Sequence, residues 1–412
     1  MTVALTSRRA SDVRVIGLIS LAHGSSHFFH LILPPMFPWL KAEFGFNYAE
    51  LGLLMTIFFV VSCIVQAASG FLVDRIGARP VLFAGIGLLA LAALTYSQSN
   101  SYGMLVLGAV IAGCGNGIFH PVDYTLINHK ISPPNLPYAY SIHGVTGYLG
   151  WAAAPAFMVA MTALFDWRIA FLGAAVLEAL VLLTLWMNRS RLVDDVKARR
   201  EESENVHAAN NPGGAALSTF GFMKLPAVWL CWIFFFFSMA ATTGLQSFAP
   251  TALFEIYELA VSSGNYYLTL MSMGGAGGML LGGYLATRMK VPERIITMCF
   301  TVNIVMGLLL ATGRVPPEII VLAFVVIGLG LGIAAPSRDL MIRSATPSGS
   351  SGRVYGIVYS GIDLGAALSP LIFGIFLDIG LPKFLFIGVA LLQLMIILIG
   401  FKVSTLGARK PV

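Results

Sequence analysis

The feature that most constrains this chain is a series of long apolar runs. A helix needs about 20 apolar residues to cross the hydrocarbon core of a membrane, and only 11% of the residues here are charged. The apolar runs cover 15–40, 48–73, 80–97, 104–127, 138–164, 170–187, 228–254, 266–286, 295–312, 319–342, 354–377 and 384–401. Because backbone groups in lipid must be satisfied within each segment, the sequence predicts an all-α membrane protein with twelve transmembrane helices.

Basic residues are distributed unevenly between the two sides that these spans create. The net charge is +6, and most Lys and Arg fall at the termini and in the loops that share a side with them. The opposite side keeps Lys41, Arg168, Arg314 and Lys383. By the positive-inside rule, we predict a multi-pass protein of the cell (inner) membrane with both termini cytoplasmic. The basic charge therefore indicates a lipid bilayer as partner and no nucleic acid.

The two halves of the chain repeat each other. A shift of 215 residues places Gly115 and Pro121 on Gly330 and Pro336 without a gap, and the register continues through the next span. Two parallel six-helix repeats around an axis normal to the membrane describe one transporter architecture, in which the substrate binds at mid-depth between the halves. We therefore expect two pseudo-symmetric six-helix bundles.

One long polar stretch separates the halves. Residues 189–226 mix acidic and basic side chains and include the run Asn-Asn-Pro-Gly-Gly, a composition typical of a flexible linker. The sequence thus predicts three parts, which are an N-terminal six-helix bundle over 1–188, a cytoplasmic linker over 189–226 and a C-terminal six-helix bundle over 227–412.

A short motif lies between the second and third runs. It contains Gly70, Asp74, Arg75, Gly77 and Arg79 in the spacing Gly-x-Leu-x-Asp-Arg-x-Gly-x-Arg. This resembles the signature loop of the major facilitator superfamily, and the resemblance implies a membrane transporter in which these five residues form a gating motif. A carboxylate at the end of a helix can pair with nearby cations or with the N-terminus of a neighbouring helix. The motif therefore implies a clasp that holds one face of the transporter closed.

Within the superfamily, the chain resembles the fosmidomycin-resistance-like efflux branch. That branch carries Ser-x-x-His in its first span, which ends here at His23, and Gly-x-Gly-x-x-x-Phe-His-Pro in its fourth, which ends here at Pro121. The branch usually places an acid four residues after the first His, whereas this chain has His27. The resemblance implies export, and the departure at His27 implies a different arrangement for moving protons.

Polar side chains inside the spans are candidates for substrate binding or coupling, because each costs several kcal/mol unless it is paired or hydrated. His23, His27 and His30 are spaced i, i+4 and i+7, so they share one stripe of the first helix. Each is interpreted either as a cavity residue or as a buried histidine bonded to a carbonyl. The full set of candidates is His23, His27, His30, His120, Asp123, His143, Gln246, Arg338 and Asp363.

The balance of charge inside the spans points to an anionic substrate. Arg338 is interpreted either as an ion-pair partner of Asp363 or as the counter-charge for an anion. A histidine titrates near pH 6.5, so the histidines can both attract an anion and exchange a proton. The sequence predicts secondary active transport of a small organic anion, of carboxylate or phosphonate type and including drugs, by proton-linked alternating access. The branch resemblance favours export.

Two alternatives remain open. Uptake of a small organic acid by proton symport uses the same residues. A transition metal or metal chelate is the other possible substrate class, since imidazole binds such metals. The chain lacks His-Glu-x-x-His and catalytic serine motifs, so we predict no enzyme, no cofactor and no resident metal. We expect a monomer whose partners are its small-molecule substrate, protons and the bilayer.

At the clasp, Asp74→Asn should lower the transport rate about tenfold or more while leaving folding and substrate affinity largely intact. The reason is that the clasp biases the equilibrium between inward-facing and outward-facing states. Flux into proteoliposomes that hold equal amounts of wild-type and variant protein measures the effect. Transport at the wild-type rate would contradict the gating role.

Overall fold

The computed structural model describes residues 2–193, 226–288, 292–345 and 351–407, so the predicted linker lies outside the described residues from 194 to 225. Every regular element assigned within these ranges is a helix. The first half comprises α1 (Thr2–His30), η1 (Pro34–Met36), α2 (Phe37–Phe44), α3 (Tyr48–Ile76), α4 (Ala78–Ser97), α5 (Tyr102–Asn116), α6 (Phe119–Lys130), η2 (Pro133–Asn135), α7 (Leu136–Leu164), α8 (Trp167–Met187) and η3 (Arg189–Leu192). The second half comprises α10 (Pro226–Tyr257), α11 (Val261–Arg288), α12 (Pro292–Ala311), α13 (Pro317–Ala345), α14 (Ser351–Asp378) and α15 (Lys383–Gly407).

Eleven candidate membrane spans lie within the described residues. The first joins α1, η1 and α2 over Ser11–Phe44, and the fourth joins α5 and α6 over Tyr102–Lys130. The predicted span over 266–286 corresponds to α11, which is long enough at 28 residues but too rich in glycine to be strongly apolar. It still packs against α13, α7 and α10. The predicted all-α fold is confirmed, and α11 is the one predicted span that is not among the eleven.

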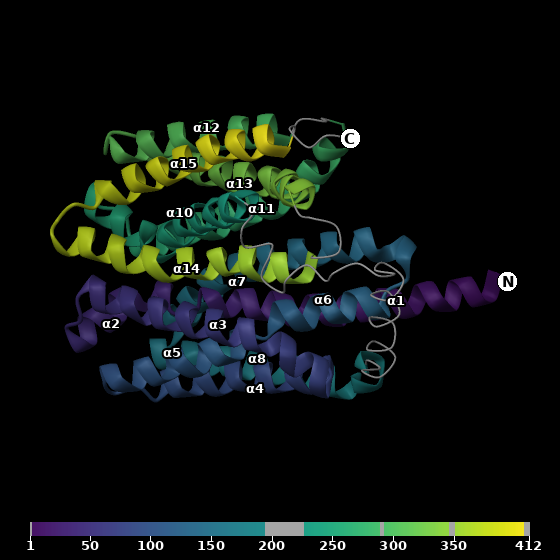
Figure 1. Cartoon of the computed structure of the whole chain (residues 1–412). Helices are drawn as coiled ribbons and strands as arrows, with labels where there is room; N and C mark the ends of the chain where they lie inside the picture. The colour runs from purple at the N-terminus through teal and green to yellow at the C-terminus, as the bar shows by residue number, and fades with distance from the viewer. Residues whose placement is uncertain (1, 194–225, 289–291, 346–350, 408–412) are drawn as a thin grey trace.

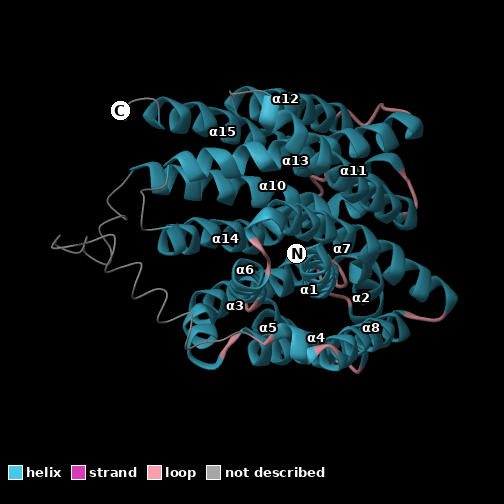
Figure 2. Cartoon of the chain, turned by 90° about the vertical axis from the view of Figure 1, so that its right-hand side faces the viewer, coloured by secondary structure: helices cyan, strands magenta, loops and turns pink. Residues whose placement is uncertain are grey.

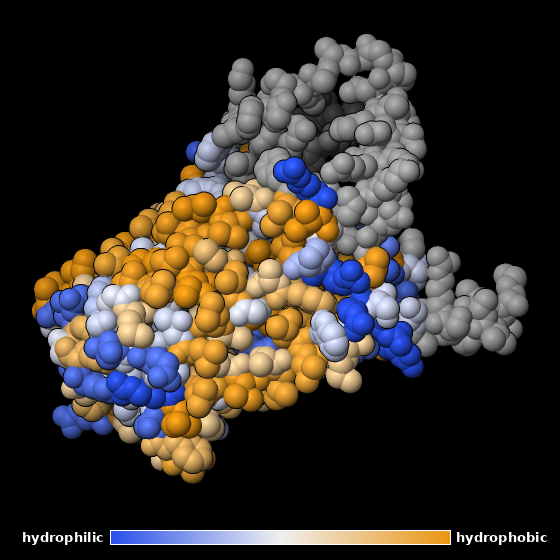
Figure 3. All heavy atoms as spheres, turned by 90° about the horizontal axis from the view of Figure 1, so that it is seen from below, coloured by the Kyte–Doolittle hydropathy of each residue, from blue (hydrophilic) through white to orange (hydrophobic). Residues whose placement is uncertain are grey.

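The outer surface carries the polarity pattern of a membrane protein. Hydrophobic residues cover the middle of the face drawn in Figure 3, and hydrophilic residues gather at its two ends. The helices of the two halves form two groups that lie side by side (Figures 1 and 2). The start of α1 and the end of α15 lie at the same end of the bundle (Figure 1). We call this the terminal end, and the opposite one the distal end.

The fourth span is interrupted where a continuous helix was predicted over 104–127. α5 ends at Asn116 and α6 begins at Phe119. Pro121, in the first turn of α6, has no backbone donor and frees a carbonyl one turn earlier, although its counterpart in the repeat, Pro336, lies inside the continuous α13. The interruption puts Asn116 and His120 near two helix ends, where their side chains reach α1 and α3.

The internal repeat is visible in the packing. A Cβ placed on Gly113 of α5 would collide with the backbone of Phe58 in α3, and one on Gly328 of α13 would collide with the backbone of Met271 in α11. Gly113 and Gly328 are 215 residues apart, and Phe58 and Met271 are 213 apart. The same close helix crossing is therefore built twice, as pseudo-symmetric bundles require. Such crossings need small residues, because the helix backbones approach each other closely.

The two halves close on each other at the distal end. Both carboxylate oxygens of Asp378, at the end of α14, accept backbone hydrogen bonds at the start of α3, from Tyr48 and Ala49, at 2.8 Å each. One turn further along α3, a Cβ on Gly52 would lie 2.5 Å from the carbonyl oxygen of Pro370 in α14. α3 and α14 are thus in direct backbone contact at this end.

Gly115→Leu and Gly330→Leu should both reduce the yield of folded protein severalfold. A Cβ on Gly115 would lie 2.8 Å from the carbonyl oxygen of Gly85, and one on Gly330 would collide with the side chain of Asn303. A leucine cannot fit at such a crossing without separating the helices. Expression and size-exclusion profiles measure the effect, with Gly103→Leu as control because the space beside Gly103 is open. Monodisperse protein at wild-type yield from both variants would count against the twin crossings.

Candidate functional site

Three histidines of α1 form one line of neighbouring rings in the first half. The ring centroids of His23 and His27 lie 4.4 Å apart, and those of His27 and His30 lie 4.9 Å apart. The predicted shared stripe is therefore present in the structure. α7 faces this line, because Gly147 and Gly150 leave room for His27 there.

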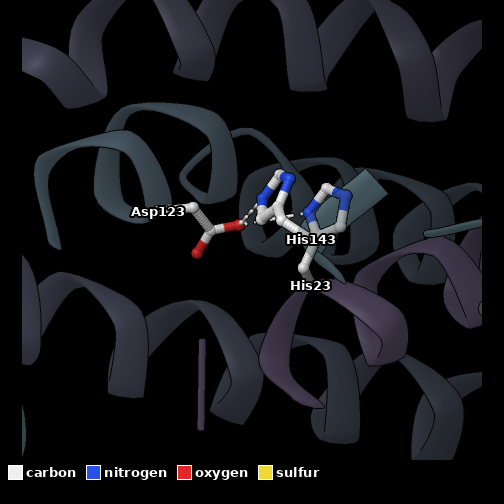
Figure 4. A group of neighbouring side chains, drawn as sticks. All are labelled: His23, Asp123 and His143. Atoms are coloured by element: carbon white, nitrogen blue, oxygen red, sulfur yellow. Dashed lines mark hydrogen bonds and ion pairs between the residues drawn. The ribbon is translucent and has the colours of Figure 1, made fainter. Parts of the chain in front are cut away.

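A buried carboxylate lies between two of the imidazoles. Nδ1 of His23 and Nε2 of His143 are each 3.1 Å from Oδ2 of Asp123 (Figure 4). The side chain of Asp123 is fully buried, and those of the two histidines are nearly so. The two histidine rings also stack, with centroids 3.5 Å apart. We call His23, Asp123 and His143 the histidine–aspartate cluster.

The cluster has a defined hydrogen-bond polarity. An ionised carboxylate only accepts, so with Asp123 in its ionised form each histidine donates its facing N–H to it. Oδ1 of Asp123 and Nδ1 of His27 have no hydrogen-bond partner among the described residues. An unpartnered buried polar atom carries a desolvation cost, and both atoms would gain from a bound proton, water or ligand.

His30 is held as a neutral imidazole by its neighbours. Nε1 of Trp151 donates to Nδ1 of His30 at 3.3 Å, so Nε2 is the nitrogen that carries the proton, and it donates to Oδ1 of Asn116 at 2.9 Å. Oδ1 of Asn116 also accepts from Ser26 at 2.8 Å, and its amide donates to Ser62 at 2.9 Å. A second proton on His30 would face the donor of Trp151. The network therefore favours a positioning role for His30.

His120 takes part in a bridge between the halves. Nδ1 of His120 donates to Oε1 of Gln66 at 2.8 Å, and the amide nitrogen of Gln66 donates to Oδ2 of Asp363 at 2.8 Å. The bridge links α6 and α3 to α14. None of the ion pairs among the described residues joins Asp363 to Arg338.

Arg338 lines a cavity between the halves. The cavity has a volume of about 60 Å³ and is bounded by α7 of the first half and by α10, α12 and α13 of the second. Arg338 is its one charged residue among those described. Trp151 belongs both to the cavity wall and to the hydrogen-bond network of His30. The cavity and the histidines therefore share a wall.

The remaining candidates lie elsewhere. Gln246 is buried in α10 with Nε2 unpartnered among the described residues, and it does not line this cavity.

In the gating motif, Gly77 has a φ of 91°, which suits a glycine at the sharp turn from α3 to α4. Arg79 donates to the carbonyl of Arg189 at 3.4 Å. The side chain of Asp74 lies outside the described residues.

Three residues of the site were not among the candidates predicted from the sequence. Gln66, Asn116 and Trp151 supply the amide and indole groups that connect the histidines to each other and to the second half. Gln66 and Asn116 are uncharged polar residues within apolar runs, and that is the signal that could have identified them.

Comparison with known proteins gives a family match. The family model of the Major Facilitator Superfamily matches residues 19–370 of this chain. In structure, the chain resembles a bacterial homologue of the human lysosomal transporter Spinster, solved in an inward-facing and occupied conformation. The TM-score is 0.72 and the sequences are 14% identical, with 95% of this chain and 97% of the other covered.

Two curated relatives are drug-resistance proteins. The fosmidomycin resistance protein of Escherichia coli K12 is 24% identical over 181 residues, which cover 44% of each chain. A multidrug resistance protein B homologue of Mycobacterium tuberculosis H37Rv is 23% identical over 391 residues, with 87% of this chain and 69% of the relative covered. The match thus spans less than half the length of the fosmidomycin resistance protein. The motifs that indicate this branch in the sequence are short as well.

Asn116→Ala should lower the free energy of unfolding by about 2 kcal/mol or more, because it leaves the buried polar groups of His30, Ser26 and Ser62 without their partner. The midpoint of thermal unfolding in detergent reports the loss. Asn100→Ala, in an exposed loop, serves as the matched control and should change little. Equal midpoints for the two variants would contradict the network.

Proposed function

The chain belongs to the Major Facilitator Superfamily, and on that basis we propose that it moves a small organic anion, of carboxylate or phosphonate type, by proton-linked alternating access. It is a membrane transporter of small molecules and not an enzyme. Export is the favoured direction, because the branch motifs and two of the curated relatives belong to drug-resistance proteins. Uptake by proton symport would use the same residues in the opposite sense.

The observation that carries the proposal is the histidine–aspartate cluster. A proton carrier inside a membrane must gain and lose a proton near ambient pH, and ionisable groups at such depth commonly mark proton pathways. Asp123 and its two imidazoles share one set of hydrogen bonds, so a proton added to either histidine forms an ion pair with the carboxylate already beside it. The cluster can therefore hold a proton without leaving an isolated charge.

The cavity supports an anionic substrate at the same depth. Arg338 contributes a permanent positive charge to its wall. Trp151 lies 4.6 Å from His27 between ring centroids and also lines the cavity. A substrate that displaces Trp151 would disturb the histidines directly, which offers a short route from substrate occupancy to proton occupancy.

The bridge formed by His120, Gln66 and Asp363 supports coupling to alternating access. It crosses between the halves, so it has to break or rearrange when they separate there. The rings of His120 and His23 are 6.0 Å apart. A proton on the cluster changes the electrostatic environment of the bridge, and a ligand shifts a conformational equilibrium only through such differential interactions.

The arrangement in the membrane completes the proposal. We infer an N-terminal bundle over 1–188, a linker over 189–226 and a C-terminal bundle over 227–412, with both termini in the cytoplasm and the protein acting as a monomer in the cell (inner) membrane. The distribution of basic residues supports this orientation.

A second candidate is transport of a transition metal. The facing atoms of His23, Asp123 and His143 all lie within 4.8 Å of one another, and two imidazoles with a carboxylate suit such ions. Zinc-dependent stabilisation of the purified protein, lost in His143→Gln, would favour this candidate. Zinc binding without zinc flux would leave the anion as the better substrate class.

Asp123→Asn should lower anion accumulation driven by a pH gradient about tenfold or more. Counterflow of the same anion should persist. The amide keeps the size of the carboxylate but cannot exchange a proton. The assay uses proteoliposomes with phenylphosphonate, methylphosphonate and gluconate, and compares gradient-driven flux with counterflow on the same vesicles.

The control for this experiment is Asp166→Asn. Asp166 is an exposed cap at the start of α8, and asparagine caps a helix equally well. Gradient-driven flux in Asp123→Asn at the rate of this control would show that the cluster does not carry the proton. Gradient-independent flux of every anion by the wild-type protein would contradict proton coupling altogether.

A further inference from the structure

The walls of the cavity between the halves are mainly apolar. Four of the residues that line it are aromatic, namely Tyr148, Trp151, Phe234 and Phe300. Four more are aliphatic, namely Met239, Leu331, Ala334 and Ala335. The polar side chains that remain are Ser238, Thr242 and Arg338. Such a lining stabilises a flat apolar surface far better than a polyhydroxylated one.

Much of the polar capacity of the wall is already used. The hydroxyl of Thr242 donates to the carbonyl oxygen of Ser238 at 2.9 Å. The indole nitrogen of Trp151 donates to His30, outside the cavity wall, so Trp151 presents its ring to the cavity. A substrate with several hydroxyl groups would leave them without partners here, at a cost of about 1–3 kcal/mol for each buried group.

The guanidinium of Arg338 is oriented by an aromatic ring. Its Cζ lies 4.7 Å from the ring centroid of Phe235, a cation–π contact. Stacking uses the face of the guanidinium, whose five N–H donors lie in its plane and point outward at the edge. A planar fork of this kind matches the paired oxygens of a carboxylate or phosphonate.

We propose that the transported anion has a compact aromatic or similarly flat apolar body, with its anionic group bound by Arg338 and its body held between α7 and the aromatic residues of α10 and α12. This rests on the anion transport proposed above and narrows it from organic anions in general to this class. Arg338 sets the charge that is accepted, and Trp151, Phe234 and Phe300 set the shape.

The site is contracted in this conformation. Its volume of about 60 Å³ is below the roughly 150 Å³ of a cavity that binds benzene. The ring of Tyr148 packs against Gly275 of α11, where a Cβ would collide with it, and this contact draws the two halves together beside the cavity. The aromatic body is therefore accommodated when α7 moves away from the second half.

Binding to the purified full chain in detergent tests the proposal, with calorimetry or thermal stabilisation as readout. The probes are phenylphosphonate, methylphosphonate, which lacks the ring, gluconate, which has a polyhydroxylated body, and benzyl alcohol, which lacks the charge. Phenylphosphonate should bind about tenfold more tightly than the other three. Arg338→Gln should remove this binding, whereas Arg314→Gln, at an exposed loop, should not. Phe300→Leu should weaken phenylphosphonate binding and leave methylphosphonate unchanged.

The outcomes separate this inference from the proposed function. Arg338-dependent binding of gluconate or methylphosphonate as tight as that of phenylphosphonate would overturn the aromatic class and leave anion transport standing. Equal binding of benzyl alcohol that is insensitive to Arg338→Gln would overturn both proposals. Absence of saturable phenylphosphonate binding up to about 10 mM would also overturn the aromatic class.

Discussion

The interaction on which the rest of the site depends is the sharing of one buried carboxylate by two imidazoles. Asp123 has no contact with solvent, so its charge is tolerable only because His23 and His143 surround it. These three residues come from α6, α1 and α7, and their contact fixes those helices against each other. The interrupted fourth span, which allows α6 to start as a new helix, therefore belongs to the same arrangement as the cluster it supports.

Much of the fold could be predicted from the sequence, because span-forming runs and a 215-residue repeat are strong signals that act over many residues. The shared stripe of His23, His27 and His30 was equally accessible, since helical spacing alone defines it. The hydrogen-bond partners of the candidate residues could not be predicted in this way. Gln66 bonds Asp363 across 297 positions of sequence, and no spacing rule relates two residues whose contact depends on how separate bundles pack.

The structure also separates candidates that the sequence treats alike. His27 and His30 are both apolar-span histidines on one face, yet the ring nitrogens of His30 are engaged by Trp151 and Asn116 while Nδ1 of His27 is unpartnered among the described residues. The indole N–H of Trp151 can only donate, so Nδ1 of His30 accepts from it and Nε2 of His30 carries the proton. Arg338 and Asp363 differ as well, because Arg338 lines the cavity whereas Asp363 accepts a hydrogen bond from Gln66.

The cap that Asp378 places on α3 has a consequence for the medium around the protein. The carboxylate belongs to the second half and the helix N-terminus to the first, so a charge–dipole attraction contributes to keeping the distal end shut. Asp378 is exposed, and attractions between exposed groups weaken as salt shortens the Debye length, to about 10 Å at 0.1 M. The ionic strength on the distal side therefore acts on the contact between the two halves, independently of any substrate.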